Sequence, residues 1–257
     1  MADKLRTTLV QTSLIWEDAP GNLQRFEKFF ESVSETDLIV LPEMFTSGFT
    51  MEPHALPGHW QEETIRWMKE QASLLDTAIA GSIVARDNGN YYNRFCFVTP
   101  DKEVFSYDKR HTFTLSGEDR FYTKGTERVL IPYKGFKICP MICYDLRFPV
   151  WSRNTEDFDV LLYVANWPLA RIDAWDTLLK ARAIENMVYT IGVNRIGSDN
   201  NGLQYNGHSA IYDALGQSLV FSEDEEILFA ELNKEHLISA RERLKFLEDR
   251  DSFNLQL

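Results

Sequence analysis

The sequence predicts a single α/β domain, and three observations support this prediction. The chain has 257 residues of which 44% are hydrophobic, enough to bury a large core. Short apolar runs alternate with segments of helical periodicity, which is the order expected of a layered α/β fold. No break in composition, internal repeat or low-complexity tract divides the chain, so we expect one domain over residues 1–257.

In the first half of the chain, the segment 37–41 is the clearest strand. It is apolar after Asp37, as expected of a strand covered on both faces, and it stops at Pro42-Glu43. The sequence Asp87-Asn88-Gly89-Asn90 predicts a hairpin turn. The other elements expected here are strands at 8–11, 77–84, 95–98 and 104–107, and helices at about 21–33 and 59–75.

The second half alternates as β-α-β-α-β after an irregular loop at 112–126. Its first strand ends at Cys143, and a short helix is expected from about Phe148. The remaining elements expected are strands at 159–164, 189–194, 209–212, 218–221 and 227–231, and helices at 172–187 and from Lys234.

The charge balance excludes several classes of partner. A formal net charge of -12 without a long Lys/Arg run argues against nucleic acid, because phosphate binding needs a basic face. The first residues contain no apolar signal core, and no apolar run is long enough to span a bilayer. We therefore expect a cytoplasmic protein with neither a nucleic-acid nor a membrane partner.

The three cysteines, Cys96, Cys139 and Cys143, form no even disulfide framework. Cys139 and Cys143 could be half of a zinc site, but no second pair or histidine cluster has the matching spacing. No nucleotide or flavin motif is present either, so we expect no metal and no cofactor.

Cys143 lies where a nucleophile is expected. A turn from a strand into a helix lifts one side chain out of the sheet, and the free backbone N–H groups of the turn can hold an oxyanion. The helix N-terminus would also lower the pKa of the thiol. The alternative is that Cys143 is a small, inert core residue.

Glu43 and Lys109 also come immediately after predicted strands, where sites of layered α/β folds are assembled. In such a trio the carboxylate takes the thiol proton, the thiolate attacks a carbonyl carbon and the ammonium stabilises the oxyanion. Taken singly, Glu43 could be a solvated carboxylate and Lys109 a basic surface residue. The conjunction of the three carries the hypothesis.

Three segments resemble the catalytic blocks of the nitrilase (carbon-nitrogen hydrolase) superfamily: Leu41-Pro42-Glu43-Met44-Phe45, Tyr107-Asp108-Lys109-Arg110-His111 and Cys143-Tyr144-Asp145-Leu146-Arg147-Phe148-Pro149. They occur in family order, and segments 163–168 and 181–186 are similar to the omega-amidase branch. The resemblance covers nearly the whole chain. It implies a four-layer αββα sandwich and a homodimer.

Carried over residue by residue, the resemblance implies that Glu43 is the general base and acid, Lys109 the oxyanion stabiliser and Cys143 the nucleophile. A second family glutamate falls on Glu118, where it would orient Lys109 and the hydrolytic water. The backbone N–H of Tyr144 would be the other oxyanion donor.

The same branch implies a small-molecule amide substrate, namely 2-oxoglutaramate or 2-oxosuccinamate, cleaved to the keto acid and ammonia. Its carboxylate needs a cation, and Arg147 is the first candidate because guanidinium binds carboxylate with two hydrogen bonds. An ion pair of Arg147 with Asp145 or Glu185 is the alternative. Phe45 and Trp167 could wall the pocket or pack in the core.

Three other readings remain open. A papain-like hydrolase would pair Cys143 with His208, which precedes a strand. The same Glu-Lys-Cys triad could act on an aliphatic amide, a nitrile or an N-carbamyl amine. A non-enzymatic binding module would have an unreactive Cys143.

Overall fold

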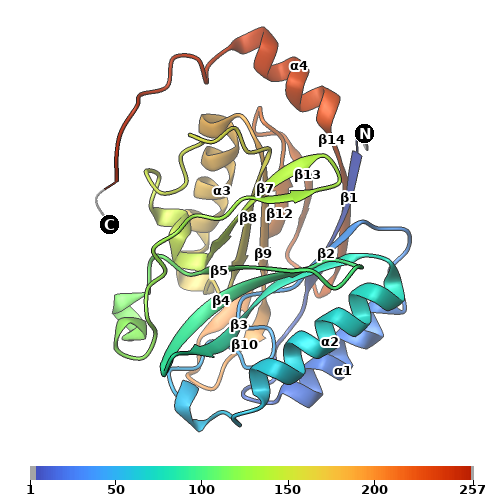
Figure 1. Ribbon diagram of the computed structural model, residues 1–257, viewed down its shortest axis with the longest axis vertical. Helices are drawn as coiled ribbons and strands as arrows, with labels where there is room; N and C mark the ends of the chain where they lie inside the picture. Colours follow the sequence, from blue (N-terminus) through green and yellow to red (C-terminus); the bar gives the residue numbers. More distant parts are fainter. Residues whose placement is uncertain (1–3, 256–257) are drawn as a thin grey trace.

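Two stacked β-sheets form the centre of the structure, a computed structural model that describes residues 4–255 (Figure 1). The first sheet contains β1 (Lys4–Gln11), β2 (Leu38–Val40), β3 (Ala78–Asp87), β4 (Asn90–Val98), β5 (Val104–Asp108) and β14 (Glu226–Asn233). The second contains β6 (Ile131–Tyr133), β7 (Phe136–Ile142), β8 (Val160–Ala165), β9 (Tyr189–Asn194), β12 (Ser209–Tyr212) and β13 (Ser218–Ser222). The strand orders are β14-β1-β2-β3-β4-β5 and β13-β12-β9-β8-β7-β6.

Helices cover the outer face of each sheet. The helices α1 (Ala19–Phe30) and α2 (Trp60–Leu75) lie on the first sheet, and α3 (Ile172–Asn186) lies on the second (Figure 1). The helix α4 (Lys234–Leu244) follows β14, and the short strands β10 (Ile196–Ser198) and β11 (Gln204–Asn206) form a separate hairpin. None of the helices in residues 4–255 combines the length and the apolar character needed to cross a bilayer.

The order of layers is therefore αββα, and this confirms the predicted four-layer sandwich with a single α/β domain. The predicted domain limits of 1–257 include residues 1–3 and 256–257, which lie outside the described part of the chain.

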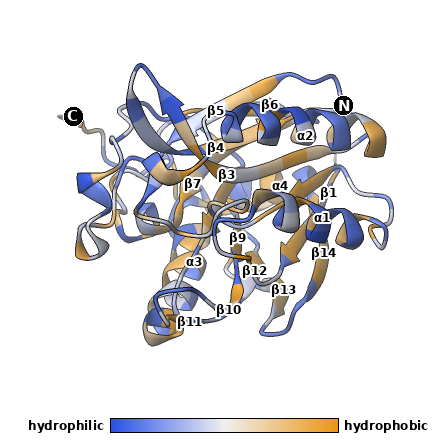
Figure 2. Cartoon of the chain, turned by 90° about the horizontal axis from the view of Figure 1, so that it is seen from below, coloured by the Kyte–Doolittle hydropathy of each residue, from blue (hydrophilic) through white to orange (hydrophobic). Residues whose placement is uncertain are grey.

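Alternating side chains of the central strands fill two different cores. In β2 and just after it, Leu38 and Val40 pack between the sheets, whereas Ile39 and Leu41 pack under α1 and α2. Successive side chains of a strand point to opposite faces, so a strand covered on both sides must be apolar throughout. Figure 2 shows hydrophobic colouring along the strands and hydrophilic colouring on the outward sides of the helices.

Several predicted elements are confirmed closely. The strands β9 and β12 have the predicted bounds, and α4 begins at Lys234. The hairpin turn between β3 and β4 has φ values of 48° at Asn88 and 84° at Gly89, as a tight hairpin of this type requires.

The prediction of a short helix from about Phe148 is wrong. A five-residue 3₁₀ helix spans Cys143–Arg147 instead, and Phe148 no longer has helical backbone angles (φ -113°, ψ 88°). The physical reason is Pro149, because a residue before proline is pushed away from helical backbone angles. The strands β6, β10 and β11 were not predicted, because three residues each are too few to show a period.

Candidate active site

The three residues of the predicted triad lie at the ends of strands from both sheets. Glu43 follows β2, Lys109 comes directly after β5, and Cys143 comes directly after β7. The Lys109 Nζ is 2.8 Å from Glu43 Oε1 and 3.0 Å from each carboxylate oxygen of Glu118. The structure thus brings together all four residues for which the sequence predicted a catalytic role.

Cys143 is held in an unusual backbone conformation. Its φ is +43°, in the left-handed region that non-glycine residues rarely adopt, at the junction between β7 and the 3₁₀ helix. Such strain at a strand-to-helix turn is typical of a nucleophile that must project from a sheet. The predicted strand-to-helix turn at Cys143 is confirmed.

The carboxylate of Glu43 is fixed by three hydrogen-bond donors. Its Oε1 accepts from Lys109 Nζ and from Asn93 Nδ2 at 2.7 Å, and its Oε2 accepts from the backbone N–H of Asn166 at 2.7 Å. The side chain is fully buried. A carboxylate held by three donors keeps one orientation.

Glu118 lies in a short 3₁₀ helix, Glu118–Arg120, inside the irregular loop that the sequence predicted. Its carboxylate accepts from Lys109 Nζ and from the backbone N–H of Phe113, and Asn93 Nδ2 lies 3.3 Å away. Glu118 therefore anchors Lys109 together with Glu43.

The electrostatics keep Lys109 charged. Burial alone would lower the pKa of this lysine, but the charges of Glu118 and Glu43 outweigh it and raise the pKa. Burial also raises the pKa of Glu118, against the lowering effect of Lys109, and the charge of Glu43 raises it further. One ammonium thus lies between two carboxylates in a site closed to water, where it is suited to stabilise an added negative charge.

The pKa of the Cys143 thiol is raised well above its ordinary value of 9.0, first by burial and then by the charge of Glu43, while Lys109 acts to lower it. The expectation that the helix N-terminus lowers this pKa is therefore wrong. The reason is that the site is buried and carries two carboxylates for one ammonium. A thiol that is neutral needs a base before it can act as a nucleophile, and Glu43 is the carboxylate whose charge acts most strongly on it.

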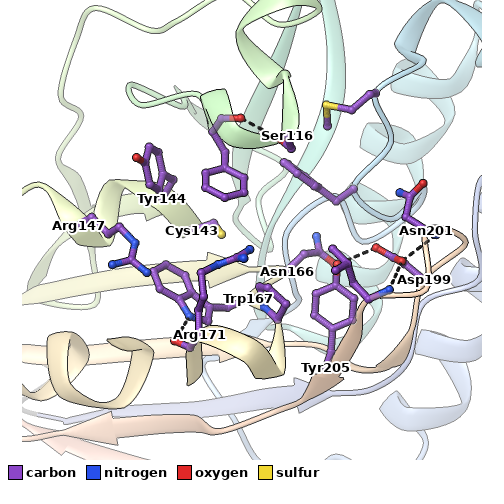
Figure 3. A pocket seen from close by; sticks show the side chains of 15 residues that line it. Ser116, Cys143, Tyr144, Arg147, Asn166, Trp167, Arg171, Asp199, Asn201 and Tyr205 are labelled. Carbon is purple, nitrogen blue, oxygen red and sulfur yellow. Dashed lines mark hydrogen bonds between the residues drawn. The ribbon is translucent and has the colours of Figure 1, made fainter. Parts of the chain in front are cut away.

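A cavity of about 350 Å³ opens above Cys143 (Figure 3). Cys143 lines it, whereas Glu43, Lys109 and Glu118 lie beneath its surface. The cavity wall is mostly apolar, and its charged lining residues are Arg147, Arg171 and Asp199.

The two arginines flank an aromatic residue on one side of the cavity. The Arg147 guanidinium lies 4.9 Å from the ring centre of Trp167, and the Trp167 Nε1 donates to the Arg171 carbonyl at 2.7 Å. The Arg171 guanidinium lies 5.1 Å from the ring centre of Phe113. Neither guanidinium forms an ion pair with any of residues 4–255. Both are therefore available to an anion.

The hairpin of β10 and β11 supplies the other side of the cavity, where Figure 3 places Asp199, Asn201 and Tyr205. The Asp199 carboxylate accepts from the Tyr205 hydroxyl at 2.8 Å and from the backbone N–H groups of Asn201 and Leu203 at 2.9 and 3.0 Å. The hairpin's own donors thus satisfy this carboxylate.

A third buried carboxylate, Asp145, connects the Cys143 turn to the Lys109 segment. Asp145 accepts from the Tyr107 hydroxyl at 2.8 Å, the His111 backbone N–H at 3.0 Å and the Ile142 N–H at 2.9 Å. Its Oδ1 is also 2.8 Å from His111 Nδ1. Since Tyr107 and His111 flank Lys109 in sequence, Asp145 fixes the lysine and the nucleophile relative to each other.

The prediction that Phe45 lines the pocket is wrong. Phe45 does not line the cavity: it is fully buried and packs edge-on against Phe26, 5.6 Å between ring centres, and against Trp67. Its side chain points toward the α1 and α2 core rather than toward Cys143. Trp167, by contrast, lies in the cavity wall.

The alternative of an ion pair for Arg147 is also wrong. Glu185 pairs with Arg182 at 2.9 Å, and Asp145 is 2.8 Å from His111 Nδ1.

The hypothesis of a papain-like hydrolase is contradicted by the position of His208. Its Nδ1 is 2.8 Å from Asp176, its ring packs against Phe221, and it does not line the cavity of Cys143. Cys139 is fully buried in the core, where burial raises its pKa to about 12, so it is not poised beside Cys143 as a metal ligand.

Asn93, Asn166 and Arg171 also belong to this site and were not predicted from the sequence. Asn166 stands in a segment similar to the omega-amidase branch and directly follows a strand, so its position was a usable signal. Asn93 lies inside β4 and Arg171 in a 3₁₀ turn before α3, and neither position carries a local pattern that points to a site.

The carbon-nitrogen hydrolase family profile matches residues 6–242. The chain belongs to the carbon-nitrogen hydrolase family. It is 47% identical over 255 residues to a Yersinia enterocolitica protein named omega-amidase YafV, with 98% of each chain covered. It is 34% identical over 253 residues to 2-oxoglutaramate amidase of Bacillus subtilis, with 96% of this chain and 97% of that protein covered.

Solved structures of this family have the same fold. A CN-hydrolase superfamily protein from Xanthomonas campestris, whose structure has an arsenic adduct in the active site, superposes with a TM-score of 0.93 at 42% identity over 98% of this chain and 99% of that one. Saccharomyces cerevisiae Nit3, a member of branch 10 of the nitrilase superfamily, superposes with a TM-score of 0.83 at 25% identity over 94% of each chain.

Proposed function

We propose that this carbon-nitrogen hydrolase is an omega-amidase, which cleaves the side-chain amide of short α-keto acid monoamides such as 2-oxoglutaramate and 2-oxosuccinamate. The observation that carries the proposal is a thiol beside a buried Glu-Lys pair, at the base of a cavity that also presents Arg147 and Arg171. The relatives named omega-amidase and 2-oxoglutaramate amidase support the same substrate class.

The substrate lies with its amide at Cys143 and its carboxylate at the arginines. Guanidinium groups bind carboxylate through two parallel hydrogen bonds, and stacking on Trp167 and Phe113 reduces the freedom that Arg147 and Arg171 lose on binding. Because the net charge of the chain is -12, the attraction for an anionic substrate is local to these two residues.

In the first half of the reaction, Cys143 Sγ bonds to the amide carbon while its proton passes to Glu43. The amide oxygen becomes an oxyanion, which the Lys109 ammonium and the Tyr144 backbone N–H stabilise. The C–N bond then breaks, Glu43 returns the proton to the nitrogen, and ammonia leaves. A thioester on Cys143 remains.

In the second half, Glu43 takes a proton from water as the water oxygen bonds to the thioester carbon. The same donors stabilise the second oxyanion, and Glu118 orients Lys109 and the water. The C–S bond breaks, the sulfur recovers its proton from Glu43, and the dicarboxylic keto acid leaves. Trp167 forms part of the wall that contains the substrate.

We further propose that the protein is a cytoplasmic homodimer, as its family resemblance implies. Exposed apolar side chains next to the catalytic turn and α3 support an interface there, with Val150 50% and Ile184 46% exposed. Light scattering on the purified protein tests the dimer, with a mass of one chain as the contradicting result.

The test of the activity is ammonia release from 2-oxoglutaramate, glutamine, an aliphatic nitrile and an N-carbamyl amino acid, each with the unmodified enzyme and with Cys143→Ala. We expect turnover of the keto amide above the others and a loss of about 10⁴-fold or more in the variant. Turnover of the nitrile or the N-carbamyl compound alone would reassign the substrate within the family. Activity retained by Cys143→Ala would refute the mechanism.

A further inference from the structure

Two buried polar side chains of the first sheet form a chain of hydrogen bonds that ends at the catalytic carboxylates. Ser82 on β3 is 0% exposed and Asn93 on β4 is 1% exposed. Ser82 pairs with Phe95 across the two strands, and Asn93 lies two residues before Phe95, so both side chains are on the face that packs between the sheets. Because neither residue lines the cavity, each can act on the substrate only through other groups.

The direction of each hydrogen bond in this chain is determined by its partners. The Met44 backbone N–H donates to Ser82 Oγ at 2.9 Å, so the single proton of the hydroxyl is directed to Asn93 Oδ1, 2.8 Å away. Asn93 Nδ2 then faces Glu43 Oε1 at 2.7 Å and Glu118 Oε1 at 3.3 Å, with one N–H group for each carboxylate. Every donor meets an acceptor, and the Asn93 amide is held in one orientation.

The same two residues hold the backbone beside the triad. The carbonyl of Asn93 accepts from the backbone N–H of Lys109 at 3.0 Å. The carbonyl of Ser82 accepts from the Phe45 N–H at 3.1 Å and its hydroxyl from the Met44 N–H, so both residues that follow the catalytic base bond to Ser82. Met44 has a φ of +46°, which a non-glycine residue keeps only where its surroundings fix it. Ser82 and Asn93 therefore connect the segments that carry the base and the lysine.

We propose that Asn93 positions both catalytic carboxylates and that Ser82 acts through Asn93, which makes both of them positioning residues for hydrolysis. The inference rests on the proposed amidase function and extends it to what holds the base. Glu43 must be ionised to take the proton of Cys143, and a buried carboxylate is costly to ionise without donors. Lys109 is one cation for two carboxylates, so the N–H groups of Asn93 add the stabilisation that this single charge cannot give to both.

A double-mutant cycle tests the proposal, with kcat and KM measured from about pH 5 to about pH 9 on 2-oxoglutaramate and butanamide. Asn93→Ala removes both N–H donors, and we expect kcat to fall about 10- to 100-fold while KM changes by less than about twofold. Because the carboxylates are then harder to ionise, the acid limb of the kcat profile should move up by about one pH unit. Ser82→Ala should change both in the same direction by less, and the double variant should be no worse than Asn93→Ala alone.

Thr7→Val is the matched control, because it also removes a fully buried hydroxyl from the first sheet, one without a hydrogen-bond partner within residues 4–255. It should leave kcat, KM and the pH profile unchanged. If Asn93→Ala does not fold, the pH profile of Ser82→Ala carries the test.

Two results would refute the proposal. One is a folded Asn93→Ala or Ser82→Ala variant with the kcat and the pH profile of the unmodified enzyme, which would reduce the hydrogen-bond chain to a structural role. The other is a double variant in which the two losses simply add, because Ser82 would then not act through Asn93. Unmodified enzyme that cleaves butanamide but not 2-oxoglutaramate would refute the proposed substrate instead, and the butanamide profiles would still decide the role of Asn93.

Discussion

The base and the mouth of the cavity differ in how their charges are held. At the base, the side chains of Glu43, Lys109 and Glu118 are at most 1% exposed, and Lys109 bonds to Glu43 at 2.8 Å and to Glu118 at 3.0 Å. At the mouth, Arg147 and Arg171 are partly exposed and contact aromatic rings instead of carboxylates. The charged groups at the base are paired with one another within the protein. The two guanidinium groups at the mouth have no such ion pair and can bind the carboxylate of the substrate.

This difference follows from what each region must do. Transition-state stabilisation requires charges that are already oriented and need no rearrangement during the reaction. Recognition of an anion requires a cation whose partner is the ligand itself, because an internal ion pair would compete with the substrate. We infer that changes at the base affect stability and turnover together, whereas changes at the mouth affect substrate preference alone.

Lys109→Met gives the largest expected effect on stability. It leaves two carboxylates buried without their counter-ion, which should reduce the free energy of unfolding by about 3 to 5 kcal/mol. Urea unfolding measures the loss, with the exposed Lys28→Met on α1 as the matched control, for which we expect a change within about 0.5 kcal/mol. Equal stability of the two variants would contradict a locked base.

Asp145→Asn should have the next largest effect. The buried carboxylate accepts from Tyr107, His111 and Ile142, and an amide NH₂ in its place would face donors. We expect a loss of about 1 to 3 kcal/mol in unfolding free energy. Turnover should also fall, because the lysine segment and the nucleophile turn lose their common anchor. Unchanged thermal stability would show that Asp145 does not belong with the buried charges at the base of the cavity.

Arg147→Met sharpens the comparison, because Arg147 lies only two residues after Asp145. Its guanidinium has no ion pair within residues 4–255 to lose, so the unfolding free energy should change by no more than about 0.5 kcal/mol. Circular dichroism melts of both variants make the comparison directly. A loss as large as that of Asp145→Asn would mean that Arg147 is structural.

The pH dependence of Cys143 alkylation tests the electrostatics at the base of the cavity. Because the pKa of this thiol is raised above 9.0, its thiolate fraction should increase about tenfold per pH unit from pH 7 through 9 without a plateau. Peptide mass spectrometry follows iodoacetamide labelling at Cys143 apart from the buried Cys96 and Cys139, whose pKa values burial raises to about 12. A plateau near pH 7 would instead indicate a preformed thiolate.

The local patterns of the sequence were sufficient for the α/β class and for the strand ends that carry Glu43, Lys109 and Cys143, whereas the four-layer arrangement was implied by the family resemblance. Continuous apolar runs such as 37–41 identify strands covered on both faces. Glu43, Lys109 and Cys143 each follow a strand that the sequence predicted. The loop that carries Glu118 has no period, and only the family resemblance pointed to that residue.

The sequence could not predict features that depend on where a side chain points or on contacts between residues far apart in the chain. Phe45 follows Glu43 by two residues, yet the chain turns between them and its ring enters the other core. The pKa of Cys143 depends on Glu43, 100 positions earlier, and on burial, neither of which a turn motif reveals. The partners of Arg147 could be eliminated only once Glu185 and Asp145 had been located.

The most direct test of the separation between base and mouth compares 2-oxoglutaramate with butanamide, an uncharged amide, in the unmodified enzyme and in Lys109→Met and Arg147→Met. We predict that Lys109→Met lowers kcat/KM for both substrates by a similar factor of about 100 to 1000. Arg147→Met should lower it about 10-fold or more for 2-oxoglutaramate and leave butanamide unchanged. Equal losses on both substrates in Arg147→Met, or a loss confined to the anionic substrate in Lys109→Met, would contradict the account.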